Sequence, residues 1–224
     1  DIYIHTWENT NSMAPSWWHK GYSNFNKTNQ EVSASSIDVE GIKKTYNPKM
    51  MMVEKNPDFP EYTGQNVPWF SPKSNEQHGN KWKSMVGCKY MLHSNRKIFE
   101  YARTQEKYDL FFSLRLDIRW LKKLDPSLIL ENKISCPVLD FSKVPNSGIN
   151  EPWFWDVFCI GNEKMMDAKT SYYHHIDEYW LNKLPASWNP SRPLYEESIT
   201  KYLSDQKTEW GFIDLPWEIV RLFN

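Results

Sequence analysis

Several features that would place the chain in a familiar class are scarce. The 224 residues include only three cysteines, Cys88, Cys136 and Cys159, whose number and spacing fit neither a disulfide framework nor a zinc site. A reducing compartment is the simpler expectation, and we expect a cytoplasmic protein. No apolar run approaches the roughly 20 residues that span a bilayer, so the sequence predicts no integral membrane segment and leaves peripheral membrane association open.

An excess of charge of one sign is also missing. The formal net charge is −1 and the sequence pI is about 6.7, whereas proteins that bind nucleic acids or anionic membranes need a concentrated basic surface. The sequence has no GxxxxGK[ST] loop, no GxGxxG after a strand and no GxSxG elbow. These absences argue against nucleic-acid binders, P-loop kinases, Rossmann dehydrogenases and serine hydrolases.

Aromatic residues, by contrast, are abundant. They make up 16% of the chain, which has 12 tryptophans. A Trp or Tyr ring offers a flat apolar face and a polar edge, and sugar rings have matching faces. Two interpretations remain open at this point, a sugar-binding surface and a tryptophan-rich core.

The hydrophobic pattern predicts strands that alternate with helices. Strands are expected at Asp1–Trp7, Tyr46–Val53, Tyr108–Leu114, Ile134–Phe141, Trp153–Ile160 and Trp210–Leu215. Helices are expected at Trp82–Arg103, Glu163–Leu184 with Asn162 as the N-cap, and Leu194–Leu203. This order predicts a single α/β domain over residues 1–224, with a mostly parallel open sheet flanked by helices.

Two strands carry a further prediction about their place in the sheet. Tyr108–Leu114 is almost wholly apolar, which is typical of a central strand covered on both faces. Pro137 cannot donate a backbone hydrogen bond, so Ile134–Phe141 is expected at an edge or a bulge.

Arg115, Asp117 and Arg119 follow the strand that ends at Leu114. Ligands of open α/β sheets bind beyond the carboxyl ends of the strands, and these three side chains share one face if the chain stays extended. A hard divalent cation takes carboxylate and phosphate oxygens, and arginines bind phosphate through paired hydrogen bonds. The trio therefore suits a diphosphate–metal site, although a structural Arg–Asp cluster is an alternative.

Asp156 lies in the predicted strand on the same face as Phe154 and Phe158. A carboxylate on an apolar face is costly unless it is paired, and burial raises the pKa of such a group, which suits a general base. The alternative is an aspartate that caps backbone amides. Trp153 and Trp155 nearby form either a stacking platform for an acceptor sugar or part of the core.

His5 ends the first predicted strand and is a further candidate, although a single histidine is more often structural. Glu196 and Glu197 begin a predicted helix, where the helix dipole already favours carboxylates. His174 and His175 are adjacent on a helix and point to different faces, so they do not form a metal-binding pair.

Three stretches together resemble one family. DIYIHTW at residues 1–7, the segment from Lys83 to Trp120, and WDVFCIGNEKMMD at residues 155–167 are similar, in order and spacing, to certain viral and bacterial glycosyltransferases. A later stretch, Glu196 to Leu203, fits the family pattern only loosely. The resemblance implies a GT-A fold, a nucleotide-sugar donor such as a UDP- or GDP-sugar, and usually Mn²⁺ or Mg²⁺.

The resemblance also implies roles for individual residues. It makes Asp117 the metal-linked acid, places Arg115 near the diphosphate, and puts Asp156 in the active site. We therefore expect donor contacts from His5, Thr6, Arg115 and Arg119, a catalytic base at Asp156 or else Glu151, and acceptor contacts from Trp153 and Trp155.

Two departures from the family pattern stand out. No strand with a Ser-Gly-Gln-like loop precedes Asp1, so we expect the natural start of the domain to lie upstream. One acid stands at Asp117 where a full Asp-x-Asp would provide two.

The sequence thus favours a glycosyltransferase that moves a sugar from a nucleotide-diphosphate donor to a glycan or another hydroxyl acceptor. The main alternative is a non-catalytic carbohydrate-binding module with Trp-rich loops. A degenerate transferase fold that serves as an interaction domain is a third possibility. A hydrolase is less favoured, because no pair of carboxylates can be placed from the sequence. The oligomeric state and the choice between inversion and retention remain open.

Overall fold

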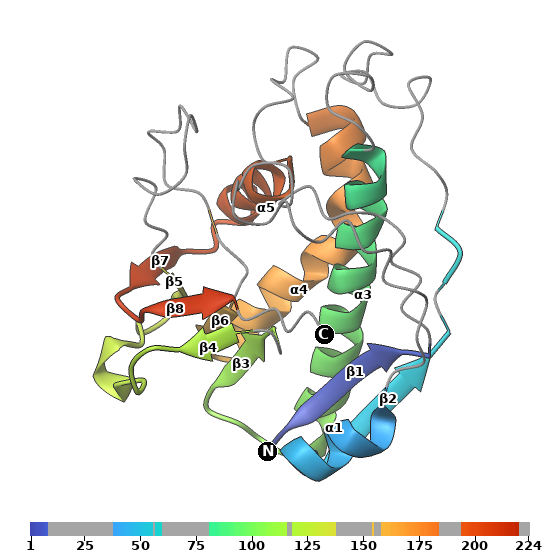
Figure 1. The fold of residues 1–224 in the computed structure, drawn as a ribbon. Coiled ribbons are helices and arrows are strands. Elements are labelled where there is room, and N and C mark those ends of the chain that lie inside the picture. The colour runs from blue at the N-terminus through green and yellow to red at the C-terminus, as the bar shows by residue number, and fades with distance from the viewer. Residues whose placement is uncertain are drawn as a thin grey trace, which may run out of the picture. The chain divides into compact units, whose positions relative to one another are not determined.

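The protein is described from a computed structural model. It covers residues 1–8, 38–55, 57–59, 81–115, 118–137, 154, 158–183 and 194–219 (Figure 1). The chain divides into two compact units, residues 1–104 and 105–224, and each is described by itself. The single domain that the sequence predicts stays a prediction.

The first unit is built around a parallel pair of strands. The strands are β1 (Tyr3–Trp7) and β2 (Met50–Glu54), and their register runs from Tyr3 opposite Met50 to Trp7 opposite Glu54. The helix α1 (Val39–Tyr46) precedes β2. Because both strands run in the same direction, their carboxyl ends lie at the same end of the pair.

Local side chains explain where α1 begins and ends. The carboxylate of Asp38 accepts a hydrogen bond from the backbone N–H of Gly41 at 2.8 Å, which satisfies a free donor of the first turn. Asn47 adopts a left-handed conformation with φ of 43°, a common helix stop. The strand predicted over Tyr46–Val53 therefore begins later than expected, since Tyr46 belongs to the helix.

The long helix α3 (Lys81–Gln105) completes the first unit and confirms the helix predicted at Trp82–Arg103. Three apolar residues that recur along it at helical spacing are buried, namely Leu92, Phe99 and Ala102. Tyr3 of β1 contacts Tyr101 of α3 edge to face, with ring centroids 6.0 Å apart. The helix thus packs on the strand pair.

The second unit is a mixed α/β structure. Its elements in chain order are β3 (Phe111–Leu114), β4 (Ile118–Trp120), the 3₁₀ helix η3 (Pro126–Leu128), β5 (Ile134–Pro137), β6 (Phe158–Gly161), α4 (Glu163–Glu178), the π-helix η5 (Tyr179–Lys183), α5 (Leu194–Asp205), β7 (Trp210–Ile213) and β8 (Trp217–Ile219). One sheet has the order β3–β6–β5–β7, and β4 pairs with β8. Only β5 and β7 run parallel here, so the parallel part of the described sheets is smaller than predicted.

Two predictions about strand positions can be compared with the described sheets. β3 lies at the end of the described sheet, and its residues Phe112 and Leu114 are 47% and 48% exposed, so the prediction of a central strand covered on both faces is wrong. β5 lies between β6 and β7 in that sheet, so the predicted edge position is wrong, while the alternative of a bulge stays a prediction. Pro137 is tolerated there because it is the last residue of β5, while the pairing with β6 is made at Ser135.

One hydrophobic cluster of the second unit is formed by residues of β6, of β7 and of the loop after β7. Phe158, Ile160, Ile213 and Leu215 form a buried cluster. The predicted N-cap of α4 is confirmed, since the side chain of Asn162 accepts a hydrogen bond from the N–H of Met165 at 3.0 Å.

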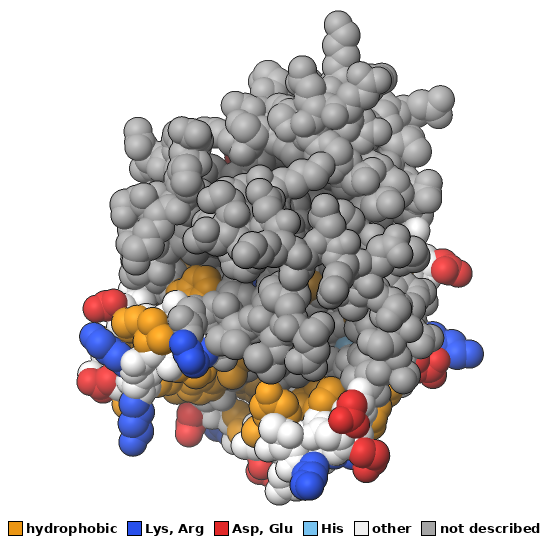
Figure 2. All heavy atoms as spheres, viewed as in Figure 1, with side chains coloured by type: hydrophobic (Ala, Val, Ile, Leu, Met, Phe, Trp, Pro, Cys, Tyr) orange, Lys and Arg blue, Asp and Glu red, His pale blue; other side chains and the backbone are white. Residues whose placement is uncertain are grey.

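The described surface shows no sorting of charge on the face drawn in Figure 2, where acidic and basic side chains intermix. None of the described helices is long and apolar enough to cross a membrane. All three cysteines lie in the described part of the chain, and the thiol of Cys136 donates to the carbonyl oxygen of Gly211.

Candidate functional site

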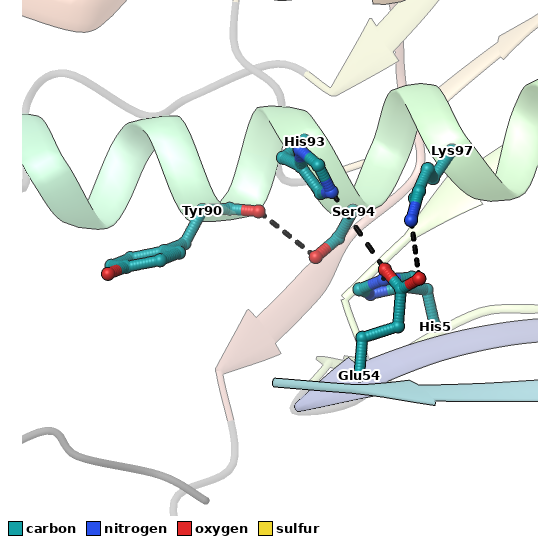
Figure 3. A network of polar contacts seen from close by, with 6 residues as sticks. All are labelled: His5, Glu54, Tyr90, His93, Ser94 and Lys97. Carbon is teal, nitrogen blue, oxygen red and sulfur yellow. Dashed lines mark hydrogen bonds and ion pairs between the residues drawn. The ribbon is translucent and has the colours of Figure 1, made fainter. Parts of the chain in front are cut away.

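A group of polar side chains gathers at the carboxyl end of the β1–β2 pair. His5 comes from β1, Glu54 is the last residue of β2, and His93 and Lys97 come from α3 (Figure 3). The two α3 residues are four positions apart, which places them on one face of the helix. Three elements that are distant in sequence therefore meet at one carboxylate.

His5 is the most buried member of this group. Its side chain is 1% exposed, and its Nε2 lies 3.0 Å from Oε2 of Glu54. With a proton on Nε2, the ring donates to the carboxylate. The other ring nitrogen, Nδ1, is buried and has no hydrogen-bond partner within the described residues. The position of His5 is therefore fixed through Glu54.

Glu54 is the centre of the group. Its second oxygen, Oε1, accepts a hydrogen bond from the ammonium of Lys97. The hydrogen bond from Lys97, followed by that from His5, holds the pKa of Glu54 below its ordinary value. Glu54 is therefore a carboxylate at neutral pH, with each oxygen directed at a different nitrogen.

His93 faces the same carboxylate from α3. Its Nε2 lies 3.9 Å from Oε2 of Glu54, and its side chain is 18% exposed. Burial lowers the pKa of His93, and the positive charges of Lys97 and His5 lower it further, against the opposing pull of Glu54. The lowered pKa favours the neutral imidazole of His93 near pH 7.

Aromatic side chains surround this polar group. The ring centroid of Trp7 lies 4.7 Å from that of His5 and 5.5 Å from that of Tyr90. Phe59 contacts Tyr90 at 4.9 Å. Tyr90 donates a hydrogen bond from its hydroxyl to the carbonyl oxygen of Pro57 at 2.9 Å, which ties this aromatic wall to the loop after β2.

A metal ion is one ligand that the polar group can hold. His5, Glu54 and His93 each offer one ligand atom, and the three atoms lie within 4.8 Å of one another. Among the described residues, no other three histidine, cysteine or acidic side chains have ligand atoms that lie this close together. The donor set, two imidazoles and one carboxylate, is of the kind that transition-metal ions prefer.

The predicted donor-binding residues are divided between the two units. Thr6 pairs with Val53 and follows His5 directly, so the alternation of the strand puts the two side chains on opposite faces. Arg115 comes directly after β3 and Arg119 lies in β4. Residues 116 and 117 between them lie outside the described part of the chain, so the shared face of the two arginines stays a prediction.

The other predicted residues lie outside the described part of the chain. These are the metal-linked acid, the two candidate bases and the two acceptor tryptophans, namely Asp117, Glu151, Trp153, Trp155 and Asp156. Their assignments remain predictions.

Sequence reasoning found His5 and missed its partners. Glu54 is a single acid at the end of an apolar strand, and its position one residue beyond the predicted strand was a usable signal. His93 and Lys97 are four residues apart in a predicted helix, a spacing that puts both on one face. Nothing in the sequence, however, indicates that this face meets β2.

No protein-family model, curated protein or solved structure matches the chain. The function therefore has to be argued from the chain's own residues and geometry.

Proposed function

We propose that the chain is a glycosyltransferase of the GT-A type, an enzyme that moves a sugar from a nucleotide-diphosphate donor to a glycan or another hydroxyl acceptor. The observation that carries the proposal is the parallel β1–β2 pair, whose carboxyl end bears Trp7 and Glu54, with His5 two residues before Trp7 and bonded to Glu54. Ligands of α/β sheets bind at this end of the strands. The motif that forms β1, DIYIHTW, is also one of the three stretches that together resemble the family.

The leaving group of the reaction is a nucleoside diphosphate, whose developing negative charge needs cations beside it. Arg115 and Arg119 are the proposed diphosphate ligands, and Asp117 between them is the proposed ligand of Mn²⁺ or Mg²⁺. In the first unit, Thr6 is a proposed donor contact. His5 is proposed to act on the donor through Glu54, since its own ring is buried.

The acceptor side of the reaction requires a base. In an inverting mechanism, a carboxylate takes the proton of the acceptor hydroxyl while that oxygen bonds to the anomeric carbon and the bond to the diphosphate breaks. Asp156 is the proposed base, with Glu151 as second choice. Trp153 and Trp155 are proposed to stack against the acceptor sugar.

The proposal is tested by calorimetric titration of UDP and GDP into the protein with and without Mn²⁺. We expect one nucleotide to bind, tighter by about tenfold or more with metal, and we expect Asp117→Ala to lose the metal-dependent part. Asp214→Ala, which removes an exposed acid from the same unit, is the matched control and should bind like the wild type. If neither nucleotide binds, the transferase proposal fails.

One observation favours a second candidate, a non-catalytic carbohydrate-binding module. Trp7, Phe59 and Tyr90 are only partly buried and lie together, as expected for a surface on which a sugar ring stacks. This candidate predicts that a free glycan binds without nucleotide or metal, and that Trp7→Ala abolishes binding. A glycan array probed with the protein alone separates the two candidates.

A further inference from the structure

We infer that His5, Glu54 and His93 form a binding site for one divalent transition-metal ion, with Zn²⁺ as the ion that suits the ligands best. The site uses no ligand of the proposed Mn²⁺ or Mg²⁺ site at Asp117, and the inference does not rest on the proposed transferase activity. It joins β1, β2 and α3 through a single ion.

The spacing of the ligand atoms fits a small ion. Two ligands that are each about 2.1 Å from Zn²⁺ at a tetrahedral angle lie about 3.4 Å apart. The distances from Oε2 of Glu54 are 3.0 Å to Nε2 of His5 and 3.9 Å to Nε2 of His93, which bracket that value. All three ligand atoms lie within 4.8 Å of one another, so rotation of the side chains has to bring the two imidazole nitrogens to the separation that a bound ion requires.

The chemistry of the ligands selects the class of ion. Mg²⁺ and Ca²⁺ prefer sites made of oxygen atoms alone. Two imidazole nitrogens with one carboxylate oxygen are typical of zinc and related transition metals. Three protein ligands also leave a fourth position of a tetrahedral zinc for water or another ligand.

The site is accessible to an ion. The side chains of Glu54 and His93 are 28% and 18% exposed, while His5 forms the buried base of the site. The ion can thus approach between the two partly exposed ligands without unfolding of the strand pair.

The effect of replacing Lys97 distinguishes a metal site from an ordinary ion-pair network. The Lys97 ammonium contacts Oε1 of Glu54 and leaves Oε2 to the histidines. A fixed positive charge beside a bound cation repels it, so Lys97 lowers the affinity for metal even as it stabilises the metal-free carboxylate. Removal of this charge therefore has opposite effects on metal binding and on the network without metal.

The test is calorimetric titration of ZnCl₂ into tag-free, chelator-treated full chain. We expect one ion per chain, with the affinity reduced by more than about 100-fold in His93→Gln and raised by about tenfold in Lys97→Met. His93→Gln removes one ligand nitrogen and keeps a polar side chain of similar size, and we expect the apo fold to persist although His93 also contacts the rings of Trp7 and Phe59. Circular dichroism of the apo variant checks this, and Glu54→Gln provides a second loss of one ligand.

His175→Gln is the matched control. It removes a helical histidine from α4 that also faces an acid, with Nδ1 of His175 at 3.6 Å from Glu178, and it should leave the affinity for zinc unchanged. Replacement of zinc by Co²⁺ adds an independent readout, since the visible absorption of the cobalt ion reports its ligands. Wild-type protein without stoichiometric zinc binding, or His93→Gln protein that binds zinc as tightly as wild type, overturns the inference.

The nucleotide experiment and this one fail independently. Loss of Mn²⁺-dependent nucleotide binding in Asp117→Ala concerns the transferase, whereas zinc binding without nucleotide concerns only His5, Glu54 and His93. A protein that binds zinc but no nucleotide supports the metal site and contradicts the proposed function.

Discussion

At the scale of single residues, Ser198 of α5 holds together the most densely bonded polar group among the described residues of the second unit. Its hydroxyl oxygen accepts hydrogen bonds from Tyr172 at 2.6 Å and from Nε1 of Trp180 at 2.9 Å, and it donates to the carbonyl of Tyr195 at 2.9 Å. Ser198, Tyr172 and Trp180 are completely buried. Neither aromatic donor can turn to water there if the serine oxygen is lost.

We therefore expect Ser198→Ala to lower the free energy of unfolding by about 2–4 kcal/mol, because two buried donors are left without their acceptor. Urea denaturation followed by circular dichroism measures the change. Ser94→Ala is the matched control: its hydroxyl only donates to the carbonyl of Tyr90 in the preceding helical turn, and the substitution should stay within about 0.5 kcal/mol. Equal losses in the two variants would mean that the buried network contributes nothing.

At the scale of elements, helices were easier to predict than sheets. The apolar spacing along α3 and the cap at Asn162 are local signals, and both gave the right element. The short helix α1 has no fully buried residue, and its apolar residues Val39, Ile42 and Tyr46 recur at helical spacing over only eight residues, too few to distinguish a helix from a strand by pattern.

Strand pairing depends on contacts between distant parts of the chain, and for this reason the sheet order was not predictable. The pairing of β5 with β7 joins residues more than 70 positions apart. The candidate site shows the same limit: His5 and Glu54 are separated by 49 positions, and Lys97 and Glu54 by 43. A single sequence shows that these residues are polar positions in or beside predicted strands and helices, but it does not show which strands and helices pack together.

The exposed edge of β3 leads to a prediction about solubility. Phe112 and Leu114 lie on one exposed face of an edge strand, a combination that favours pairing with another chain. We expect Leu114→Lys to reduce concentration-dependent aggregation, measured by light scattering, with a stability change within about 0.5 kcal/mol.

Leu121→Lys is the matched control for this prediction. Leu121 is 53% exposed and lies outside the strands, so its replacement removes a similar apolar side chain without charging the edge. If Leu121→Lys reduces aggregation as much as Leu114→Lys does, exposed apolar area rather than the strand edge drives the association.

At the scale of the whole molecule, the question is whether the two units unfold together. The first unit has its own buried residues on β1 and α3, such as Ile4, Leu92 and Phe99, and the second has the cluster of Phe158 and Ile213. Two separate cores can each support a cooperative transition. If the chain is instead the single domain predicted from the sequence, a destabilising substitution lowers the free energy of unfolding of all of residues 1–224 together.

Hydrogen exchange of Ser198→Ala, read by mass spectrometry under native conditions, distinguishes these cases. Amides that exchange only by unfolding of their cooperative unit report the stability of that unit. With separate cores, exchange rises about 30-fold or more in α4, α5 and β6, which corresponds to about 2 kcal/mol, and stays at the wild-type rate in α3. An equal rise in α3 would show that one transition covers the chain, and the zinc site and the α5 network would then stabilise the same folded state.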